Sequence, residues 1–283
     1  MLAYYQKLLA IKIAENNEAL GSSSLLRDAC DYALTNGGKR IRPALVLMIA
    51  DALGKQRDAT QAALAIEYFH TASLVADDLP CMDDDDARRN KPSVHKVYGE
   101  AAALLVSYAL IAAGYACIEK GTKKLPNGDR VCALALENAT YNTGLHGATG
   151  GQFLDLYPPN LEETTLREII HKKTVSLFEI AFVFGWLYGG GDPRQLFLVK
   201  CAAAHFGMAF QIADDLGDVE QDAENGRVVN YANLYGHARA LEIVQEELEL
   251  YKQALKALNL HAPALYDVAD ELITLPLQQQ LRP

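Results

Sequence analysis

The chain reads as one helical segment after another, and this pattern constrains its fold more than any other feature. Ala and Leu dominate, and alternating runs of β-branched residues are scarce. Short breaks rich in Gly, Pro, Asn and Asp separate the segments, and none is long enough to be a linker. Helices are predicted near residues 2–20, 24–35, 41–53, 58–78, 94–119, 129–146, 164–187, 195–218 and 237–258. We therefore expect an all-α fold, a helical bundle in a single domain over residues 1–283.

Composition narrows the class of protein. Half of the 283 residues are apolar, so a sizeable core is available. The net charge is −10, which argues against nucleic acid or an anionic membrane surface as the main partner. The five cysteines are far apart and form no Cys-x-x-Cys pair, which favours free thiols in a reducing compartment. The N-terminal sequence has no signal-peptide pattern, so a cytoplasmic protein is expected.

The apolar run AAALLVSYALIAAGYACI at residues 101–118 is just long enough to be considered as a membrane span. Its Ala, Ser, Gly and Tyr content makes it only mildly hydrophobic. A helix that is hydrophobic all round is typical of a protein core. We expect this helix to be buried on all sides within the protein, with no stable membrane insertion.

A first acidic motif lies in ADDLPCMDDDDARRNK, residues 76–91. Asp77 and Asp78 end a predicted helix, Pro80 bends the chain, and Asp83 follows the bend. This arrangement can direct the carboxylates of Asp77 and Asp83 at one point, and Mg²⁺ binds through a few carboxylates and the oxygens of a phosphate. An EF-hand is excluded because the loop glycine and closing Glu are absent. A solvated acidic turn remains an equal alternative on this motif alone.

A second acidic motif, FQIADDLGDVEQD at residues 210–222, changes that balance. It contains Asp214, Asp215 and Asp218. Asp214 and Asp218 are one helical turn apart and share a face, and Gln211 precedes them by one turn. Two aspartate triplets, each near the end of an apolar helix, indicate a site built between facing helices.

Cationic side chains accompany the acidic motifs. Lys39 and Arg42 are three residues apart at a predicted helix start, where backbone amides also favour an anion. His70 lies two helical turns before Asp77. The remaining candidates are Arg88, Arg89, Lys173 and Thr174. Each alone is typical of an ordinary surface or core residue. Together they supply cations for a phosphorylated substrate beside carboxylates for Mg²⁺, which favours diphosphate chemistry.

At this point the sequence resembles the trans-isoprenyl diphosphate synthases, the family of farnesyl and geranylgeranyl diphosphate synthases. The resemblance runs from GGKRIRP through DDLPCMDDDDARRNKPSVHKVYGEA, GGQFLDL, HKKT and FQIADDLGD to NYANLYG. It implies the all-α isoprenoid synthase fold with a deep central cavity, usually in a homodimer. It also implies condensation of isopentenyl diphosphate with an allylic diphosphate.

The resemblance assigns a role to each candidate. Three Mg²⁺ ions per active site are expected on the allylic diphosphate, with Arg88 and Lys173 contacting that same diphosphate. Thr174 and Gln211 are expected near the allylic head, where their oxygen dipoles stabilise a cation. The residues expected to bind the isopentenyl diphosphate are Lys39, Arg42, His70 and Arg89, and the metal ligands are Asp77, Asp78, Asp83, Asp214, Asp215 and Asp218.

Product length depends on the helix that carries Asp77. Ala72 and Ser73 precede Asp77 by five and four residues, and Ala72 leaves room for more than fifteen carbons. Phe69 and Tyr68, one turn deeper, are candidates for the floor of the cavity, unless they face a neighbouring helix. A C20 product, geranylgeranyl diphosphate, is therefore favoured over a C15 product.

The chain departs from the family pattern at three places. Ala76 replaces a common His, and Ser107-Tyr108 replaces a common Gly-Asp, so Tyr108 is a second candidate for limiting product length. The segment after Asp218 is short and offers only Arg227 where the family usually carries a lysine.

Two other functions share these motifs. A class I terpene cyclase has the same fold and first motif, but its second motif normally carries Asn, Ser and Glu. A regulatory subunit of a heteromeric prenyl synthase tends to lose metal aspartates, whereas both triplets are intact here.

Overall fold

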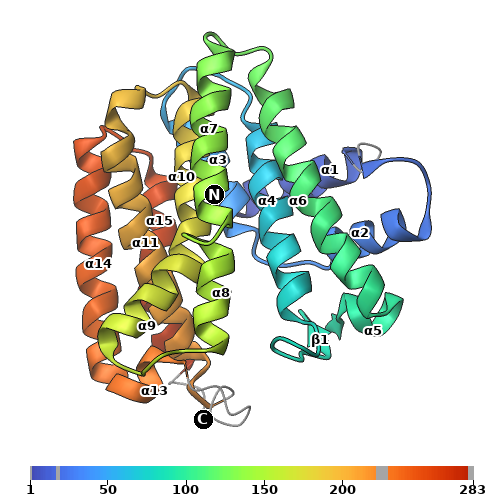
Figure 1. The fold of residues 1–283 in the computed structure, drawn as a ribbon. Coiled ribbons are helices and arrows are strands. Elements are labelled where there is room, and N and C mark those ends of the chain that lie inside the picture. Colours follow the sequence, from blue (N-terminus) through green and yellow to red (C-terminus); the bar gives the residue numbers. More distant parts are fainter. Residues whose placement is uncertain (1, 17–19, 221–228, 280–283) are drawn as a thin grey trace. The chain divides into compact units, whose positions relative to one another are not determined.

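The computed structural model describes residues 2–16, 20–220 and 229–279, and these are predominantly helical (Figure 1). The all-α prediction is confirmed. In chain order the elements are α1 (Leu2–Glu15), α2 (Leu25–Thr35), α3 (Ile41–Ala52), α4 (Thr60–Asp77), β1 (Ala87–Arg88), β2 (Lys91–Pro92), α5 (Val94–Tyr98), α6 (Glu100–Thr122), α7 (Gly128–Thr143), α8 (Ala148–Leu156), α9 (Glu163–Ile170), the π-helical segment η2 (His171–Val175), α10 (Ser176–Gly189), the 3₁₀ turn η3 (Pro193–Gln195), α11 (Leu196–Gly217), α13 (Tyr231–Tyr235), α14 (His237–Ala257) and α15 (Pro263–Gln279).

Two predicted helices are interrupted. The helix expected at residues 94–119 is broken at Gly99, whose φ of 85° lies in the left-handed region that a helix does not use. The helix expected at 164–187 contains the π-helical segment η2. The sequence also did not predict α8, α13, α15 or the antiparallel pair of strands β1 and β2.

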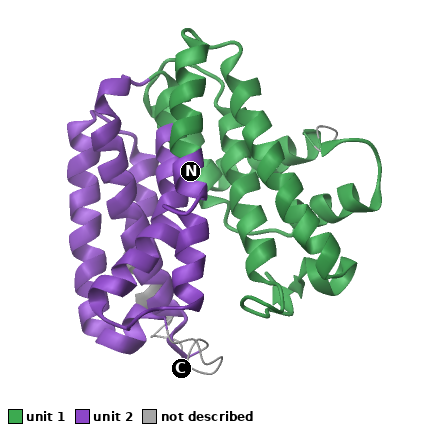
Figure 2. Ribbon diagram, in the orientation of Figure 1, with its two compact units in different colours: residues 1–139, 184–190 green, residues 140–183, 191–283 purple. Residues whose placement is uncertain are grey.

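The chain divides into two compact units (Figure 2). Unit 1 comprises residues 1–139 and 184–190, and unit 2 comprises residues 140–183 and 191–283. Each unit is described by itself below. A single polyprenyl synthase domain over residues 1–283 stays a prediction.

Helix α4 is the centre of unit 1. It runs beside α6 in Figure 1 and also packs against α1 and α3. The packing against α6 is close at Gly114, where an added Cβ would lie 2.5 Å from Cε1 of Phe69. The ring of Phe69 also lies against Tyr115, with centroids 5.0 Å apart. A small residue at position 114 therefore lets an aromatic side chain of α4 lie on the surface of α6.

Aromatic side chains form the core of unit 2, where α11 packs along α14. The ring centroid of Phe178 lies 5.2 Å from that of Phe206 and 4.9 Å from that of Phe210. Tyr251 on α14 lies 5.2 Å from Phe206. These tilted and edge-to-face contacts add directional preference to ordinary apolar burial. These contacts fix the part of α11 that precedes the second aspartate motif.

A buried ion pair joins the start of α3 to the middle of α4. Arg40 has a left-handed φ of 47° and donates to Oε1 of Glu67 and to the carbonyl of Leu34. The side chains of Arg40 and Glu67 are only 8% and 1% exposed. Thr71 donates a further hydrogen bond of 3.2 Å to the same carboxylate oxygen. The pair fixes the chain direction at GGKRIRP relative to α4.

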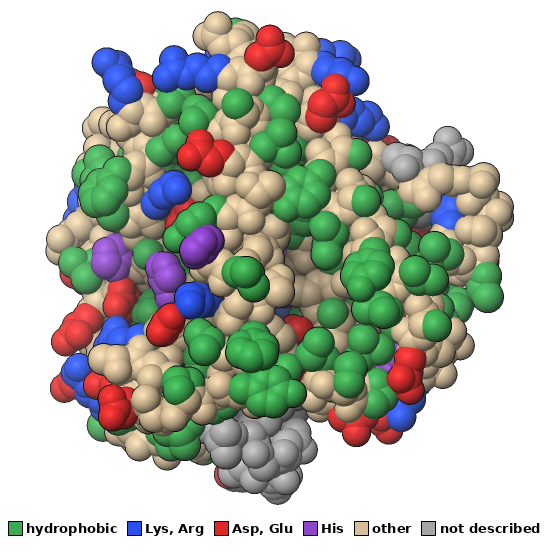
Figure 3. Space-filling model, in the orientation of Figure 1, with side chains coloured by type: hydrophobic (Ala, Val, Ile, Leu, Met, Phe, Trp, Pro, Cys, Tyr) green, Lys and Arg blue, Asp and Glu red, His purple; other side chains and the backbone are tan. Residues whose placement is uncertain are grey.

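The outer face of α6 corrects one expectation. Leu104, Leu105, Tyr108 and Ile111 are 36–60% exposed, so this helix is not buried on all sides. Figure 3 shows hydrophobic side chains gathered over α6. Two helical stretches, Glu100–Thr122 and Pro193–Gly217, are long and apolar enough to cross a membrane by length and composition alone. The core helices of soluble proteins pass the same test, so this finding is weak evidence for a membrane span.

Glu67→Ala should lower the free energy of unfolding by about 3–5 kcal/mol, because it leaves the buried guanidinium of Arg40 unpaired. Urea unfolding followed by circular dichroism measures the change. The double variant Arg40→Met/Glu67→Leu should recover most of the loss, since it leaves no buried charge. Glu119→Ala, which removes a solvent-exposed partner of Lys123, is the matched control and should cost less than about 1 kcal/mol. Equal losses in Glu67→Ala and Glu119→Ala would contradict the argument.

Candidate active site

The first aspartate motif forms a tight loop at the end of α4. Asp77 is the last residue of α4, and its carbonyl accepts a hydrogen bond of 2.8 Å from the backbone amide of Asp83. A second bond of 2.8 Å, from the amide of Met82 to the carbonyl of Leu79, tightens the same loop. The structure therefore brings the backbones of Asp77 and Asp83 together, as the bend at Pro80 predicted.

Asp78 points into the protein and contacts Arg88. It is buried, and Oδ1 accepts a 2.8 Å hydrogen bond from Nε of Arg88 and a second from Nη2. Burial raises the pKa of Asp78, and the bond to Arg88 opposes that rise. Nη2 of Arg88 also lies 2.7 Å from Oδ2 of Asp85. Two carboxylates thus hold the Arg88 guanidinium in one orientation, whereas metal binding by Asp78 stays a prediction.

A two-residue hairpin positions Arg88 and Arg89. Strands β1 and β2 pair through Ala87 with Pro92 and Arg88 with Lys91. Arg89 and Asn90 have φ of 56° and 63°, as both central residues of a type I′ turn require. Arg89 donates to the carbonyl of Gly37 and covers Gly38, where an added Cβ would lie 2.2 Å from Cζ of Arg89. Arg89 is therefore placed over the loop that carries Lys39.

His70 lies in the same cationic region of unit 1. Nη1 of Arg42 lies 3.3 Å from Nε2 of His70. Burial and then the charges of Arg42, Arg89, Arg40 and Arg88 hold the pKa of His70 well below its usual value, so His70 is neutral near pH 7. Guanidinium only donates, so Nε2 accepts and the proton is assigned to Nδ1. That buried Nδ1 has no hydrogen-bond partner among the described residues.

The chemical consequence is an anion-binding arrangement. The neutral His70 offers an N–H donor, while Arg42 and Arg89 supply charge and Lys39 stands exposed at the start of α3. A terminal phosphate fits such a set because guanidinium and ammonium groups form charge-assisted hydrogen bonds with its oxygens. The structure brings together Arg42, His70 and Arg89, which the family resemblance assigned to one substrate.

The second aspartate motif ends α11 in unit 2. Asp214 and Asp218 are exposed, and the amide of Asp218 donates 3.1 Å to the carbonyl of Asp214. Asp215 is buried instead. Its Oδ1 accepts a 2.8 Å hydrogen bond from Nε2 of Gln211, and Oδ2 accepts one of 2.8 Å from the amide of Tyr231. Asp215 therefore orients the Gln211 amide and holds the start of α13, and metal binding by Asp215 stays a prediction.

Gln211 continues this chain of hydrogen bonds to Thr174. The hydroxyl of Thr174 donates 2.6 Å to Oε1 of Gln211, whose amide nitrogen donates to Asp215. The structure thus brings together two residues predicted for the allylic head. Their mutual contact fixes which end of the Gln211 amide faces Thr174.

Lys173 and Thr174 lie in the π-helical segment η2, a feature that recurs at functional sites. Lys173 pairs with Asp155 on α8. The approach of α8 to η2 is close: a Cβ added at Gly151 would lie 2.2 Å from the backbone nitrogen of Lys173. The close packing therefore explains why a glycine stands at position 151. Asp155, which lies in GGQFLDL, is a candidate site residue that sequence reasoning missed.

The predicted chain-length residues are buried in unit 1. Ala72 is fully buried, and its carbonyl accepts a 2.8 Å hydrogen bond from Ser107. The hydroxyl of Tyr68 accepts 2.8 Å from Nδ2 of Asn16 on the side of α1, and burial raises the pKa of Tyr68 to about 12. Phe69 faces α6, as described above. Ser73 donates 2.9 Å to the carbonyl of His70.

These contacts show that Tyr68 and Phe69 each lie against a neighbouring helix, which was the alternative open at the level of sequence. Tyr108 is 60% exposed and is not part of the packing between α4 and α6. Arg227 lies outside the described residues.

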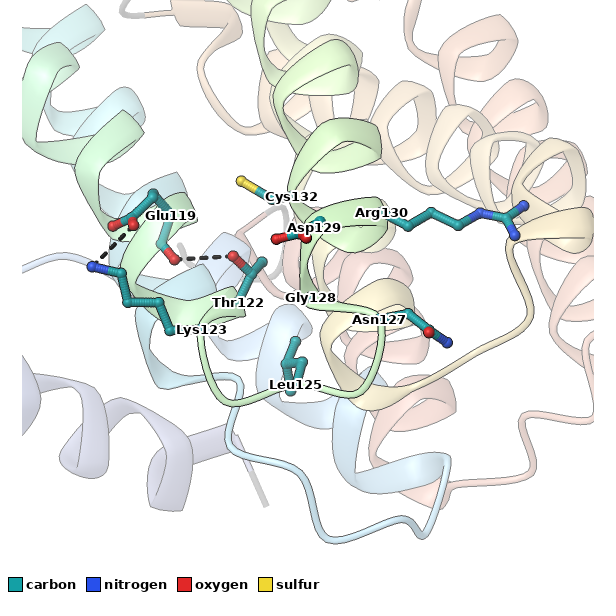
Figure 4. Close-up of a pocket in the computed structure, with 9 residues that line it drawn as sticks. All are labelled: Glu119, Thr122, Lys123, Leu125, Asn127, Gly128, Asp129, Arg130 and Cys132. Carbon is teal, nitrogen blue, oxygen red and sulfur yellow. Dashed lines mark hydrogen bonds and ion pairs between the residues drawn. The ribbon is translucent and has the colours of Figure 1, made fainter.

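A surface pocket of about 650 Å³ lies where α6 connects to α7 (Figure 4). Its lining includes Glu119, Lys123, Asp129 and Arg130, and none of the predicted site residues. Arg130 points away from Glu119 and Asp129 in Figure 4, so the charged groups do not converge on a ligand. The candidate functional residues of each unit remain those around its own aspartate motif.

Comparisons with known proteins agree with these motifs. The sequence model of the family described as "Polyprenyl synthetase" matches residues 23–230. The farnesyl diphosphate synthase of Bacillus subtilis (strain 168) is 32% identical over 282 residues, which cover 95% of each chain. Geranylgeranyl pyrophosphate synthase 3, chloroplastic, of Arabidopsis thaliana is 36% identical over 267 residues, covering 86% of this chain and 74% of the relative.

A solved structure shows the same architecture. The crystal structure of geranyltransferase from Legionella pneumophila superposes with a TM-score of 0.85 at 27% sequence identity. The match covers 96% of this chain and 95% of the other. The likeness therefore extends over both compact units rather than over the motifs alone.

The lowered pKa of His70 has a measurable effect on stability. The unfolded chain takes up a proton at His70 below about pH 6.5 and the folded chain does not, so stability is lost as the pH falls through that value. The free energy of unfolding should fall between about pH 7.5 and pH 5.5 in both proteins. The fall should be smaller in His70→Gln than in the wild type, by up to about 1.4 kcal/mol. Urea unfolding at the two pH values measures this difference. An identical pH dependence in both proteins would show that His70 titrates normally in the folded state.

Proposed function

The chain belongs to the polyprenyl synthetase family and is a trans-prenyltransferase, and we propose that it condenses isopentenyl diphosphate with allylic diphosphates to geranylgeranyl diphosphate. One observation carries most of this proposal. Arg42, Arg89 and neutral His70 form an anion-binding cluster in the same unit as the loop of Asp77 and Asp83. The cationic cluster would bind one diphosphate, and the carboxylates would bind the metal that accompanies a second diphosphate. Such a pair of binding sites fits a reaction between two diphosphate substrates.

The residues present fit Mg²⁺. Hard carboxylate oxygens are the ligands that Mg²⁺ prefers, and Asp77, Asp83, Asp214 and Asp218 offer them at half-exposed or exposed positions. We propose that both motifs hold metal, three ions per active site. When bound, Mg²⁺ supplies charge that stabilises the departing diphosphate. Asp78 and Asp215 each support the motif of their own unit, through their contacts with Arg88 and Gln211.

Side chains of the protein bind the allylic diphosphate and stabilise the charges that form in the reaction. Arg88, fixed by Asp78 and Asp85, and Lys173, fixed by Asp155, present cations to the allylic diphosphate. Preorganised charges of this kind stabilise negative charge as it develops on the leaving group. The hydroxyl and amide oxygens of Thr174 and Gln211 face the allylic cation. Cleavage of the carbon–oxygen bond releases the diphosphate and leaves an allylic cation, which the double bond of isopentenyl diphosphate attacks. The condensed cation then loses a proton to the released diphosphate, so no protein base is required.

Removal of one carboxylate from either motif tests the metal assignment. Asp77→Ala and Asp214→Ala should each lower turnover by orders of magnitude while leaving the far-ultraviolet circular dichroism unchanged. Asp129→Ala, an exposed aspartate at the start of α7, is the matched control and should retain activity. Turnover is measured with labelled isopentenyl diphosphate and an allylic primer. Near-normal turnover in both motif variants would remove the metal role.

The C20 product rests on the size of Ala72, because Tyr68 and Phe69 each lie against a neighbouring helix. The relatives do not decide between lengths, because the Bacillus protein is named for C15 and the Arabidopsis protein for C20. Farnesyl diphosphate is therefore the second candidate. The intact Asp triplets and the cluster of Arg42 and His70 favour elongation over a terpene cyclase or a regulatory subunit.

Product analysis with C5, C10 and C15 primers tests the length. The wild type should release a C20 diphosphate, and Ala72→Phe should shorten the main product to C15 because a larger side chain at position 72 leaves less room for the growing chain. Phe197→Ala, at an exposed position, is the control. A C15 product from the wild type would keep the enzyme class and move the limit to another residue. Release of a hydrocarbon would support the cyclase.

We further propose a cytoplasmic homodimer in which the outer face of α6 contacts a second copy. The exposed side chains of Leu104, Leu105, Tyr108 and Ile111 recur at helical spacing and form an apolar stripe. Contiguous exposed apolar surface marks interaction sites in soluble proteins. A self-complementary helix face suits the two-fold symmetry of most homodimers.

Leu105→Glu should convert the dimer to a monomer, because it places a charge at the centre of the apolar stripe. Sedimentation velocity measures the mass at several protein concentrations. Leu250→Glu replaces a leucine on α14 that is 43% exposed, against 50% for Leu105, and should leave the dimer intact. A wild-type protein that sediments as a monomer at all concentrations would refute the assembly.

A further inference from the structure

Three side chains outside the two aspartate motifs converge beside the hairpin. One carboxylate oxygen of Asp84, one of Asp86 and one imidazole nitrogen of His95 lie within 4.8 Å of one another. The two aspartates are exposed, and His95 is only 7% exposed. These residues were not among the sequence-based candidates, because nothing in their spacing separates them from the neighbouring acidic run.

The backbone around the cluster is well defined. Asp84 has a left-handed φ of 52°, and its amide donates 3.2 Å to the carbonyl of Leu79. The carbonyl of Asp86 accepts 3.0 Å from the amide of Ser93, which extends the pairing of β1 with β2 by one step. The two aspartates thus precede the hairpin, and His95 follows it on α5. The hairpin returns the chain to the aspartates.

His95 gives independent evidence for a ligand. Its Nδ1 lies 3.1 Å from the hydroxyl of buried Ser93. Its Nε2 is buried and has no hydrogen-bond partner within the part of the chain that the structure describes. Metal-binding histidines usually use one ring nitrogen as the ligand and donate a hydrogen bond from the other. A buried imidazole nitrogen without a partner costs free energy unless something binds it.

We propose that Asp84, Asp86 and His95 bind a divalent transition-metal ion of the Zn²⁺ class at a site separate from the Mg²⁺ ligands. Two carboxylates and an imidazole are common ligands of Zn²⁺. Zinc–ligand distances of about 2.0–2.2 Å require ligand atoms about 3–3.5 Å apart. Rotation of the exposed Asp84 and Asp86 side chains is enough to close the remaining separation. The solvent-facing side leaves room for water as a further ligand.

The donor set distinguishes this site from the proposed magnesium site. Mg²⁺ selects oxygen ligands and retains water, whereas an imidazole nitrogen suits Zn²⁺ and its neighbours in the transition series. Lys96 now lies 2.6 Å from Oδ1 of Asp86, and this contact raises the pKa of Lys96. The lysine shows that the surroundings attract cations. As a solvent-exposed ion pair it is weak enough for a bound metal ion to displace.

A metal ion at this site would act on the hairpin. Its ligands lie on both sides of β1 and β2, which carry Arg88 and lead into Arg89. Binding would therefore close the hairpin at its open end and hold both arginines in place. The site does not depend on the proposed function, since it requires neither diphosphate nor turnover.

Isothermal titration with ZnCl₂ in excess Mg²⁺ tests the proposal, because Mg²⁺ occupies the oxygen-only sites. The protein carries Cys81→Ser, which removes an exposed thiol near the site. The parent should bind one Zn²⁺, and Asp86→Asn and His95→Asn should each weaken that binding by about 100-fold or more. Asp86→Asn is decisive, because its side chain is 72% exposed and its loss does not disturb the core.

Asp85→Asn is the matched control. Asp85 lies between the two ligands in sequence but pairs with Arg88, so its replacement should leave Zn²⁺ affinity unchanged. Co²⁺ in place of Zn²⁺ should give visible absorption bands that disappear in His95→Asn. Equal Zn²⁺ affinity in the parent and Asp86→Asn overturns the proposal. So does an equal loss in Asp85→Asn, which would show attraction to the acidic segment as a whole.

Discussion

The buried pair between Arg40 and Glu67 is the interaction on which the candidate functional residues of unit 1 depend. Arg40 takes a left-handed conformation and turns its side chain inward, and α3 begins at the next residue. Lys39 remains exposed on one side of Arg40, and Arg42 reaches His70 on the other. Glu67 lies on α4, the helix that also carries His70 and ends in Asp77. One ion pair therefore sets the register between the cationic loop and the aspartate motif.

Each aspartate motif contains one buried aspartate and one more accessible aspartate next to it. In each, a buried aspartate turns away from solvent and orients a group predicted to face substrate: Asp78 holds Arg88, and Asp215 holds Gln211. The neighbouring carboxylates, Asp77 and Asp214, are more accessible. Adjacent aspartates thus separate into one that supports the structure and one that is more accessible, which we propose as a metal ligand. This separation limits the repulsion that paired carboxylates would otherwise suffer.

Helical spacing predicted the helical class and the shared face of Gln211, Asp214 and Asp218. The grouping of Arg42 with His70 and of Thr174 with Gln211 came from the family resemblance, because each pair lies on two different elements. Sequence reasoning did not predict η2, since the π-helical turn accompanies the close approach of α8 at Gly151, a non-local contact. It did not pair Lys173 with Asp155 for the same reason. Strands of two residues have no periodicity to detect, so the hairpin and the His95 cluster that depends on it were missed as well.

Helix α6 shows why one sequence-based expectation was wrong for the single chain. Its composition is apolar all round, and such a helix is expected to be buried. The inner face meets this expectation, because Gly114 receives Phe69 and Ser107 bonds to the carbonyl of Ala72. On the outer face Leu105 and Tyr108 are at least half exposed. Each Å² of apolar surface left in water forgoes about 25 cal/mol of stabilising free energy. If a second copy covers that face, the expected burial belongs to the assembly rather than to one chain.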